Sequence, residues 1–324
     1  MSGAVRYRIR HDTAYHYGSD VVHSHQLLHL VPRPAPYQQC LEHSIEISPA
    51  GCRRRDEIDA FGNPVTRIEF DYPHRSLAVT SRMEVDVHAR PPAPAADTLA
   101  WERVAAELGY HGRAPARESL EACRFRHESP YVRVKRMFTD FAADCFAADR
   151  PVLGCAAALM SKLHRDVSYA PGATTIGTPL PDVLRNRRGV CQDFAHLMIA
   201  CLRSRGLAAR YVSGYVRSFP PRAGTPEAGA AGRGATTPLQ GDLPAAAGSP
   251  PLVGAGASHA WVAVYCPPFG WIELDPTNDT YIGTDHVAIA WGRDFGDVSP
   301  LRGMILGGGS HRLTVSVDVE RLPA

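Results

Sequence analysis

Two cysteines stand ten residues apart in the stretch "RNRRGVCQDFAHLMIACLRSRGL" (residues 185–207). Cys191 follows a Gly-Val pair where a helix is expected to begin, and Cys201 lies about three turns deeper, on the apolar face of that helix. A cysteine attacks carbonyl groups as a thiolate, which the positive end of a helix dipole stabilises. The position favours Cys191 as a nucleophile and Cys201 as a core residue, although a cysteine in such a helix is more often only buried.

A base and an orienting acid for such a thiolate are offered by the strands "SHAWVAVY" (258–265) and "GWIELDP" (270–276). If the tyrosine that ends the first strand pairs with the tryptophan that begins the second, His259 and Asp275 become diagonal neighbours on one face. Their Cα atoms would then lie about 7–8 Å apart, within reach of a side-chain hydrogen bond. A slip of one residue would put them on opposite faces. Together with Cys191, this arrangement predicts nucleophilic cysteine chemistry.

The composition of the whole chain limits what else it could be. It has 324 residues, of which 44% are hydrophobic, and a formal net charge of +2. Its basic residues form no long run, so neither nucleic acid nor a membrane surface is expected as a partner. No apolar stretch of about eighteen residues is present, and "MSGAVRYRIRHD" lacks the apolar core of a secretory signal. We therefore expect a cytoplasmic protein. We also expect no disulfide scaffold, because the eight cysteines form no CxxC pair.

Periodicity divides the chain into three regions that would position the three residues. Residues 1–92 alternate between polar and apolar, which predicts an antiparallel β-sandwich module. A helical connecting segment follows over 93–150. The catalytic domain is expected over 151–324, with a central helix at 191–205 packed on an antiparallel sheet. Within it, 220–257 is rich in Ala, Gly and Pro and is expected to be a disordered insertion. The fold class is therefore α+β.

Three motif blocks resemble those of the bacterial transglutaminase-like superfamily, which belongs to the papain-like Cys-His-Asp enzymes. They read "GVCQDFAHLMIACLRSRGLAARYVSGY", "SHAWVAVY" and "GWIELDPTND". The flanking stretches "VRYRIRHDTAYHY" and "LHLVPRP" are similar to the β-rich N-terminal module that often accompanies this catalytic domain. The C-terminal stretch "GRDFGDVSPLRGMILGGGSHRLTVSVDVERL" is similar too. The resemblance covers the chain apart from 220–257, and it implies a nucleophile at Cys191, a base at His259 and an orienting acid at Asp275.

Other candidate residues rest on weaker grounds. The oxyanion glutamine of papain-like proteases has no counterpart here, because Arg185 stands six residues before the cysteine. Gln192, or Tyr169 in "SYAPGATT", could supply a second oxyanion donor beside the backbone N–H of the nucleophile. Trp261 could wall the substrate site, and packing within the sheet explains it equally well. No cofactor is expected. The "HSH" of residues 23–25 could place two ligands on one strand face, but no metal site is expected there.

A thiolate, a histidine and an aspartate serve several reactions, so the residues alone leave the reaction open. Hydrolysis of a peptide or isopeptide amide through an acyl-thioester is the favoured interpretation. A true transglutaminase with an amine acceptor, or a non-catalytic peptide-binding module, remains an alternative. The expected partner is a peptide or protein substrate, with the oligomeric state open. The resemblance also implies a functional link to ATP-grasp-type peptide ligases.

Overall fold

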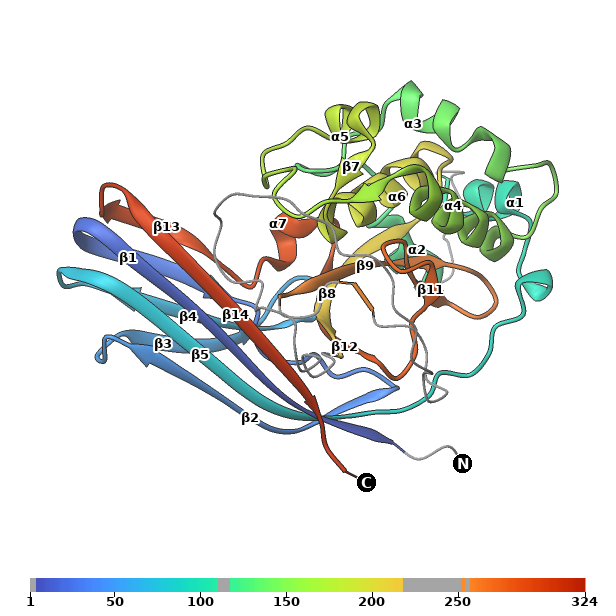
Figure 1. Ribbon diagram of the computed structural model, residues 1–324. Coiled ribbons are helices and arrows are strands. Elements are labelled where there is room, and N and C mark those ends of the chain that lie inside the picture. Colours follow the sequence, from blue (N-terminus) through green and yellow to red (C-terminus); the bar gives the residue numbers. More distant parts are fainter. Residues whose placement is uncertain (1–3, 110–116, 218–251, 254–256, 324) are drawn as a thin grey trace, which may run out of the picture.

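The computed structural model of the chain describes residues 4–109, 117–217, 252–253 and 257–323. A long curled sheet forms one side of the molecule, and a body of helices around a second sheet forms the other (Figure 1). The insertion expected at 220–257 lies almost entirely outside the described residues. Within the described part of the chain, no helix is both long and apolar enough to cross a membrane.

The curled sheet is antiparallel and is built around one long strand, β1 (Val5–Leu28). The first half of β1 pairs with β5, with a register shift between His16 and Val21, and the second half pairs with β4. β2 and β3 extend the sheet beyond these two strands. The bounds of the added strands are Gln38–Ser48 for β2, Arg53–Ile58 for β3, Pro64–Phe70 for β4 and His74–Val87 for β5.

Alternation along these strands gives the sheet one apolar and one polar face. The apolar face carries the buried residues of β1, β4 and β5, and part of it forms a separate apolar cluster that includes Leu28, Phe70 and Leu77. The other face is polar and open to solvent. The expected antiparallel N-terminal β module is therefore confirmed, but its strands form one continuous curled sheet and not the predicted sandwich, because the two remaining strands that pair with β1 come from the C-terminal end of the chain.

The last two strands of the chain, β13 (Leu301–Gly307) and β14 (His311–Arg321), also belong to this sheet. β13 pairs with the second half of β1, and β14 pairs with the first half. This pairing differs from the sequence-based expectation, which grouped the whole of 151–324 with the catalytic domain. The cause is that strand pairing between distant segments leaves no local pattern in the sequence. The division into domains otherwise stays a prediction.

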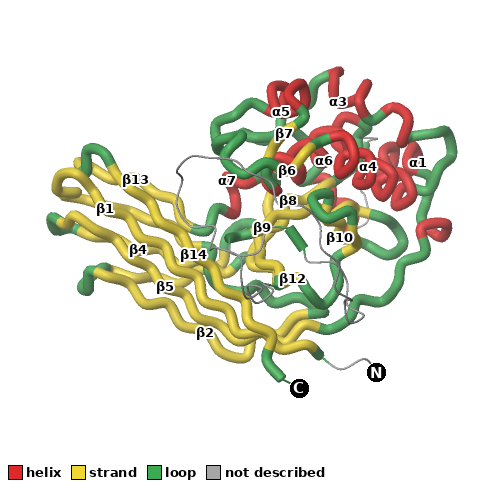
Figure 2. The backbone as a smooth tube through the Cα atoms, in the orientation of Figure 1, coloured by secondary structure: helices red, strands yellow, loops and turns green. Residues whose placement is uncertain are grey.

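The second sheet has five antiparallel strands in the order β11-β10-β9-β8-β12. The helix α6 (Cys191–Ser204) packs against β8 and β9, and α3, α4 and α5 pack around it (Figure 2). The strands are β8 (Ala209–Val216), β9 (His259–Tyr265), β10 (Trp271–Asp275), β11 (Thr280–Tyr281) and β12 (His286–Gly292). The other helices are α1 (Trp101–Glu107), α2 (Arg117–Cys123), α3 (Arg136–Phe141), α4 (Val152–Asp166), α5 (Leu180–Asn186) and α7 (Phe295–Val298).

The central helix α6 is buried over nearly its whole length, as its apolar sequence predicts. Its C-terminal end is anchored by Arg203, which is also buried. The Arg203 guanidinium donates to the carbonyl oxygens of Phe125 at 2.9 Å, Ala209 at 2.9 Å and Arg293 at 2.6 Å. These bonds satisfy a buried charge with backbone acceptors and hold α6 at a fixed place on the sheet.

Candidate active site

Cys191 is the first residue of α6. The turn before it is held by Asp193, whose Oδ2 accepts from the Val190 N–H at 2.8 Å and from the Thr174 hydroxyl at 2.6 Å. A Cβ at Gly189 would come within 2.7 Å of the Asp193 Cβ, so only glycine allows this close entry. The sequence "GVCQD" thus places a half-buried thiol at the positive end of a long helix.

His259 and Asp275 lie on the adjacent strands β9 and β10, in the register that the sequence predicts. Trp271 pairs with Tyr265, which confirms the expected alignment of the two strands. The His259 Nε2 and the Asp275 Oδ2 are 2.7 Å apart, and both side chains are fully buried. Because a carboxylate only accepts, the Nε2 carries the proton in this bond. The buried Nδ1 of His259 has no hydrogen-bond partner among the described residues.

The Asp275 carboxylate is surrounded by donors. Its Oδ1 accepts from the Thr277 N–H at 2.9 Å, and its Oδ2 accepts from the Asn278 side-chain amide at 2.7 Å. A second histidine, His286 at the start of β12, lies with its Nε2 3.3 Å from the same Oδ2. A buried carboxylate with this many donors is held in its charged form and in one orientation.

These contacts shift the pKa values of the three buried groups in different directions. Burial alone would lower the pKa of His259, but the charge and hydrogen bond of Asp275, together with the nearby Cys191 thiol, raise it well above its ordinary value. Burial alone would raise the pKa of Asp275, but His259 and His286 hold it well below its usual range. Burial lowers the pKa of His286 despite its bond to Asp275. The Asp275 carboxylate therefore favours an additional proton on His259, whereas burial favours the neutral form of His286.

A cavity of about 460 Å³ opens over Cys191 and His259. It lies where the start of α6 meets the ends of β8 and β9. Its lining is formed by Tyr169, Pro171, Val190, Cys191, Gln192, Tyr211, Ser213, Ala257, Ser258, His259, Ala260 and Phe295. The Cys191 Sγ is 4.0 Å from the backbone carbonyl oxygen of Ser258. The structure therefore brings the cysteine and the histidine of the sequence-based expectation into one cavity, with the aspartate directly behind the histidine.

The weaker candidates fall in different places. Gln192 lines the cavity, and so does Tyr169, which is held beside the turn that precedes Cys191 by the pairing of β6 (Ser168–Tyr169) with β7 (Arg188–Gly189). Trp261 does not line it. Its ring is fully buried behind His259, with centroids 6.1 Å apart, and its Nε1 donates to Glu273 at 2.6 Å. Trp261 therefore packs within an apolar cluster with Val212, Ile282 and Ala288 and does not wall this cavity.

The sequence reasoning missed His286 and Asn278. Asn278 follows Asp275 by three residues, and its position just after a strand was a usable signal, because Asn and Asp side chains often bond within such turns. For His286 the only local signal is the alternation of "HVAIAWG", which predicts a strand without indicating its neighbours. His286 reaches the site only because β12 pairs with β8.

The buried histidines and the aspartate also form the one set of possible metal ligands found among the described residues. The ligand atoms of His259, Asp275 and His286 all lie within 4.8 Å of one another. Two imidazoles and a carboxylate are a set that divalent transition metals accept. Here, however, the same atoms bond to each other, and a cation would have to replace the 2.7 Å bond between His259 and Asp275.

Two known protein families match parts of this chain. The family described as "Transglutaminase-like superfamily" matches residues 139–276, a range that contains Cys191, His259 and Asp275. The family described as "Bacterial transglutaminase-like N-terminal region" matches residues 7–86. Both matches agree with the motif blocks and flanking stretches of the sequence.

Relatives extend the match over nearly the whole chain. An uncharacterised protein of Mycobacterium tuberculosis is 34% identical, over 98% of this chain and 94% of its own length. Another from Mycobacterium leprae is 31% identical, over 98% of this chain and 99% of its own length. The crystal structure of a candidate cysteine protease from Cytophaga hutchinsonii aligns with a TM-score of 0.68 at 20% identity, covering 100% of this chain and 92% of the other. It confirms the expected fold, and the chain belongs to the transglutaminase-like superfamily, with the bacterial N-terminal region of that family preceding its core.

Proposed function

We propose that the protein is a cysteine-dependent acyl-transfer enzyme that hydrolyses a peptide or isopeptide amide through an acyl-thioester on Cys191. The observation that carries the proposal is the state of the His259 ring. Its Nε2 is bound to a buried carboxylate, and its buried Nδ1 has no hydrogen-bond partner among the described residues. Cys191 lines the same cavity, and its thiol is one of the groups that raise the pKa of His259. An imidazole held in this way is ready to accept a thiol proton.

The proposed reaction begins with transfer of the Cys191 thiol proton to the Nδ1 of His259. The resulting imidazolium is stabilised by the Asp275 carboxylate, and the thiolate by the N-terminal end of α6. The thiolate then attacks the amide carbon, and the carbonyl oxygen becomes an oxyanion. The backbone N–H of Cys191, at the start of the helix, is the nearest donor of the kind that stabilises such an oxyanion. Gln192 and Tyr169, which line the cavity, are the candidates for a second donor.

Collapse of this intermediate breaks the carbon–nitrogen bond. His259 returns its proton to the leaving amine, and an acyl-thioester remains on Cys191. In hydrolysis, water attacks the thioester while His259 takes a proton from it, and the thiol is regenerated. In a transglutaminase, an amine attacks at the same step. The same three residues serve both outcomes, so access of the acceptor decides between them.

The lining of the cavity supports a neutral acyl group as the substrate. Among the described residues that line it, none is Asp, Glu, Lys or Arg, whereas Tyr169, Tyr211 and Phe295 offer aromatic surface. A charged acyl side chain would lose its hydration there without gaining an opposite charge. We therefore expect substrates whose acyl side chain is uncharged.

Selective alkylation tests whether Cys191 is activated. Iodoacetamide near pH 6, followed by peptide mapping with mass spectrometry, should modify Cys191 faster than the similarly half-buried Cys52, whose pKa is raised by burial. His259→Gln should remove the advantage of Cys191. Equal rates for Cys191 and Cys52 in the unmodified protein would rule against an activated nucleophile and favour a binding module.

A second experiment separates hydrolysis from amine transfer. A glutamine-containing peptide library is incubated with the protein and a labelled primary amine. Hydrolysis predicts release of free amine or ammonia without label in the products, and an acyl group trapped on Cys191 in rapid-quench samples. Incorporation of the label at a comparable rate would instead support a transglutaminase.

A further inference from the structure

The strands β13 and β14 form one edge of the curled sheet. They follow each other along the same side of β1, with a short turn between them. No other strand of the described residues pairs with their outer side. Such an edge exposes unpaired backbone N–H and C=O groups and invites pairing with another chain, unless proline, inward-pointing charges or a covering segment protect it.

The apolar face of β14 continues past the part of the body that covers it. Val317 and Val319 are buried, whereas Leu313 and Val315 on the same face are 47% and 46% exposed. No proline lies between residues 301 and 321, and no charged residue interrupts this face between Leu313 and Val319. No proline protects this edge, no strand of the described part of the chain covers it, and it carries apolar side chains that a neighbouring strand would cover.

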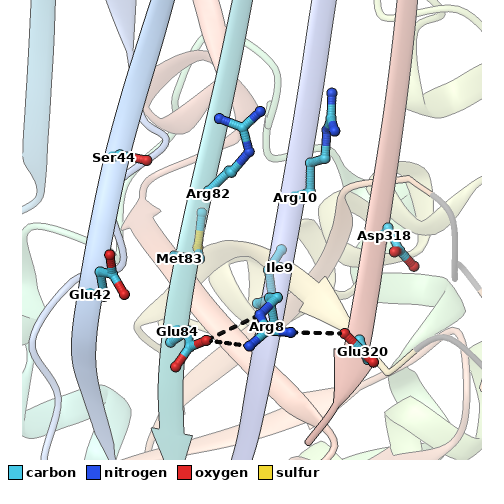
Figure 3. A pocket seen from close by; sticks show the side chains of 10 residues that line it. All are labelled: Arg8, Ile9, Arg10, Glu42, Ser44, Arg82, Met83, Glu84, Asp318 and Glu320. Atoms are coloured by element: carbon cyan, nitrogen blue, oxygen red, sulfur yellow. Dashed lines mark hydrogen bonds and ion pairs between the residues drawn. The ribbon is translucent and has the colours of Figure 1, made fainter.

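The opposite face of β14 is polar and ends a ladder of charges that crosses the sheet. Arg8 on β1 lies between Glu84 on β5, at 2.8 Å, and Glu320 on β14, at 3.6 Å (Figure 3). Asp318, the next residue along this face of β14, has no ion pair among the described residues. The row of alternating charges therefore ends at the sheet edge with the carboxylates of Asp318 and Glu320. A positively charged side chain on a further strand would continue it.

We propose that two copies of this chain associate through β14, with the two strands antiparallel around a two-fold axis at Ser316. The sequence of β14 is complementary to itself in this register. Arg312 lies opposite Glu320 of the second copy, so the charge ladder continues across the interface. On the other face, Leu313 lies opposite Val319 and Val315 opposite Val317 of the second copy. Each copy would cover the exposed apolar residues of the other.

Other registers fit less well. A shift by one residue would place Val315 opposite Ser316 and mix the polar and apolar faces. An axis at Asp318 would set two carboxylates directly opposite each other, which is destabilising. An axis at Thr314 would leave Glu320 without a facing residue on the strand. The sequence therefore selects the axis at Ser316, and this inference does not depend on the proposed reaction.

A cysteine at the axis gives a direct test. In the proposed dimer the two Ser316 residues face each other, so Ser316→Cys should yield a disulfide-linked dimer under mild oxidation. Ser44→Cys is the matched control, because Ser44 is an exposed residue of β2 at the opposite edge. A cross-link through Ser44→Cys, and none through Ser316→Cys, would overturn the proposal.

Charge reversal tests the register. Sedimentation of the native protein should show a dimer, and Arg312→Glu and Glu320→Arg should each weaken it about tenfold or more, because the two-fold axis repeats each clash. The double variant should restore the affinity. Arg55→Glu, on the exposed strand β3 at the other edge, should leave it unchanged. Melting curves check that each variant is folded. The proposal would be overturned if the native protein were a monomer at about 100 μM, or if neither single variant weakened the dimer.

Discussion

The His259 imidazole and the Asp275 carboxylate lie 2.7 Å apart at a place where neither side chain has any exposed surface. Burying either charge alone would be unfavourable, and the attraction between the two opposite charges offsets the cost of removing each from water. The pKa of His259 is raised and that of Asp275 is lowered. The contribution of His259 to stability is therefore complete below its unfolded pKa of about 6.5 and is lost as the pH rises through its higher folded value. The contribution of Asp275 is complete above about 3.9 and is lost as the pH falls through its lower folded value.

The first prediction concerns Asp275→Asn. The amide oxygen can still accept from His259, but the negative charge that raises the histidine pKa is gone. We expect kcat/KM for an amide substrate to fall about 10²- to 10⁴-fold. The basic limb of the pH–rate profile should also move to lower pH, because the imidazolium loses its counter-charge. A profile with an unchanged basic limb would show that Asp275 does not set the charge state of His259.

The second prediction separates the two cysteines of α6. Cys191→Ser should abolish activity, with a change in unfolding free energy within about 0.5 kcal/mol, because the residue is only partly buried at the helix start. Cys201 is fully buried, and burial raises the pKa of its thiol well above the usual range. Cys201→Ser should cost about 1–3 kcal/mol, because its hydroxyl group lacks a partner in the core. Its folded fraction should keep full activity, measured as rate per active site.

The residues nearest each other in sequence are the most predictable part of this site. The helix start at Cys191 follows from a glycine just before it and an apolar run after it. The shared face of His259 and Asp275 follows from strand alternation and a short turn, and the observed register agrees. Both inferences use only local rules of helix and strand geometry.

Long-range pairing accounts for what the sequence did not indicate. His286 joins the site through the pairing of β12 with β8, and β14 joins the N-terminal sheet by pairing with β1. Neither pairing leaves a local pattern. The position of Trp261 is ambiguous in the sequence for the same reason, since strand alternation gives the face of a side chain but not what covers that face.

The third prediction concerns His286, which we expect to be a positioning residue. Its neutral ring bonds the carboxylate that orients His259. His286→Leu removes this donor from a buried acceptor and should cost about 1–3 kcal/mol of stability. It should also lower kcat about tenfold and shift the pH–rate profile, whereas His286→Asn, which keeps an N–H group, should recover part of both. A loss of stability with an unchanged kcat and profile would show a purely structural role.

The last prediction concerns Gly214 on β8, which lets Trp261 and β12 approach the strand. A Cβ at this position would come within 2.2 Å of the Val287 carbonyl oxygen and 2.4 Å of the Trp261 ring. Gly214→Ala should therefore cost about 1–3 kcal/mol in chemical denaturation. It should also reduce kcat, because the strand that carries His286 must move. Gly283→Ala is the matched control, since a Cβ there meets no atom within 4 Å, and its change should stay within about 0.5 kcal/mol. If the two variants were equally stable, β8 and β12 could move apart to accept the added methyl group without cost. The close packing at Gly214 would then not fix the position of His286.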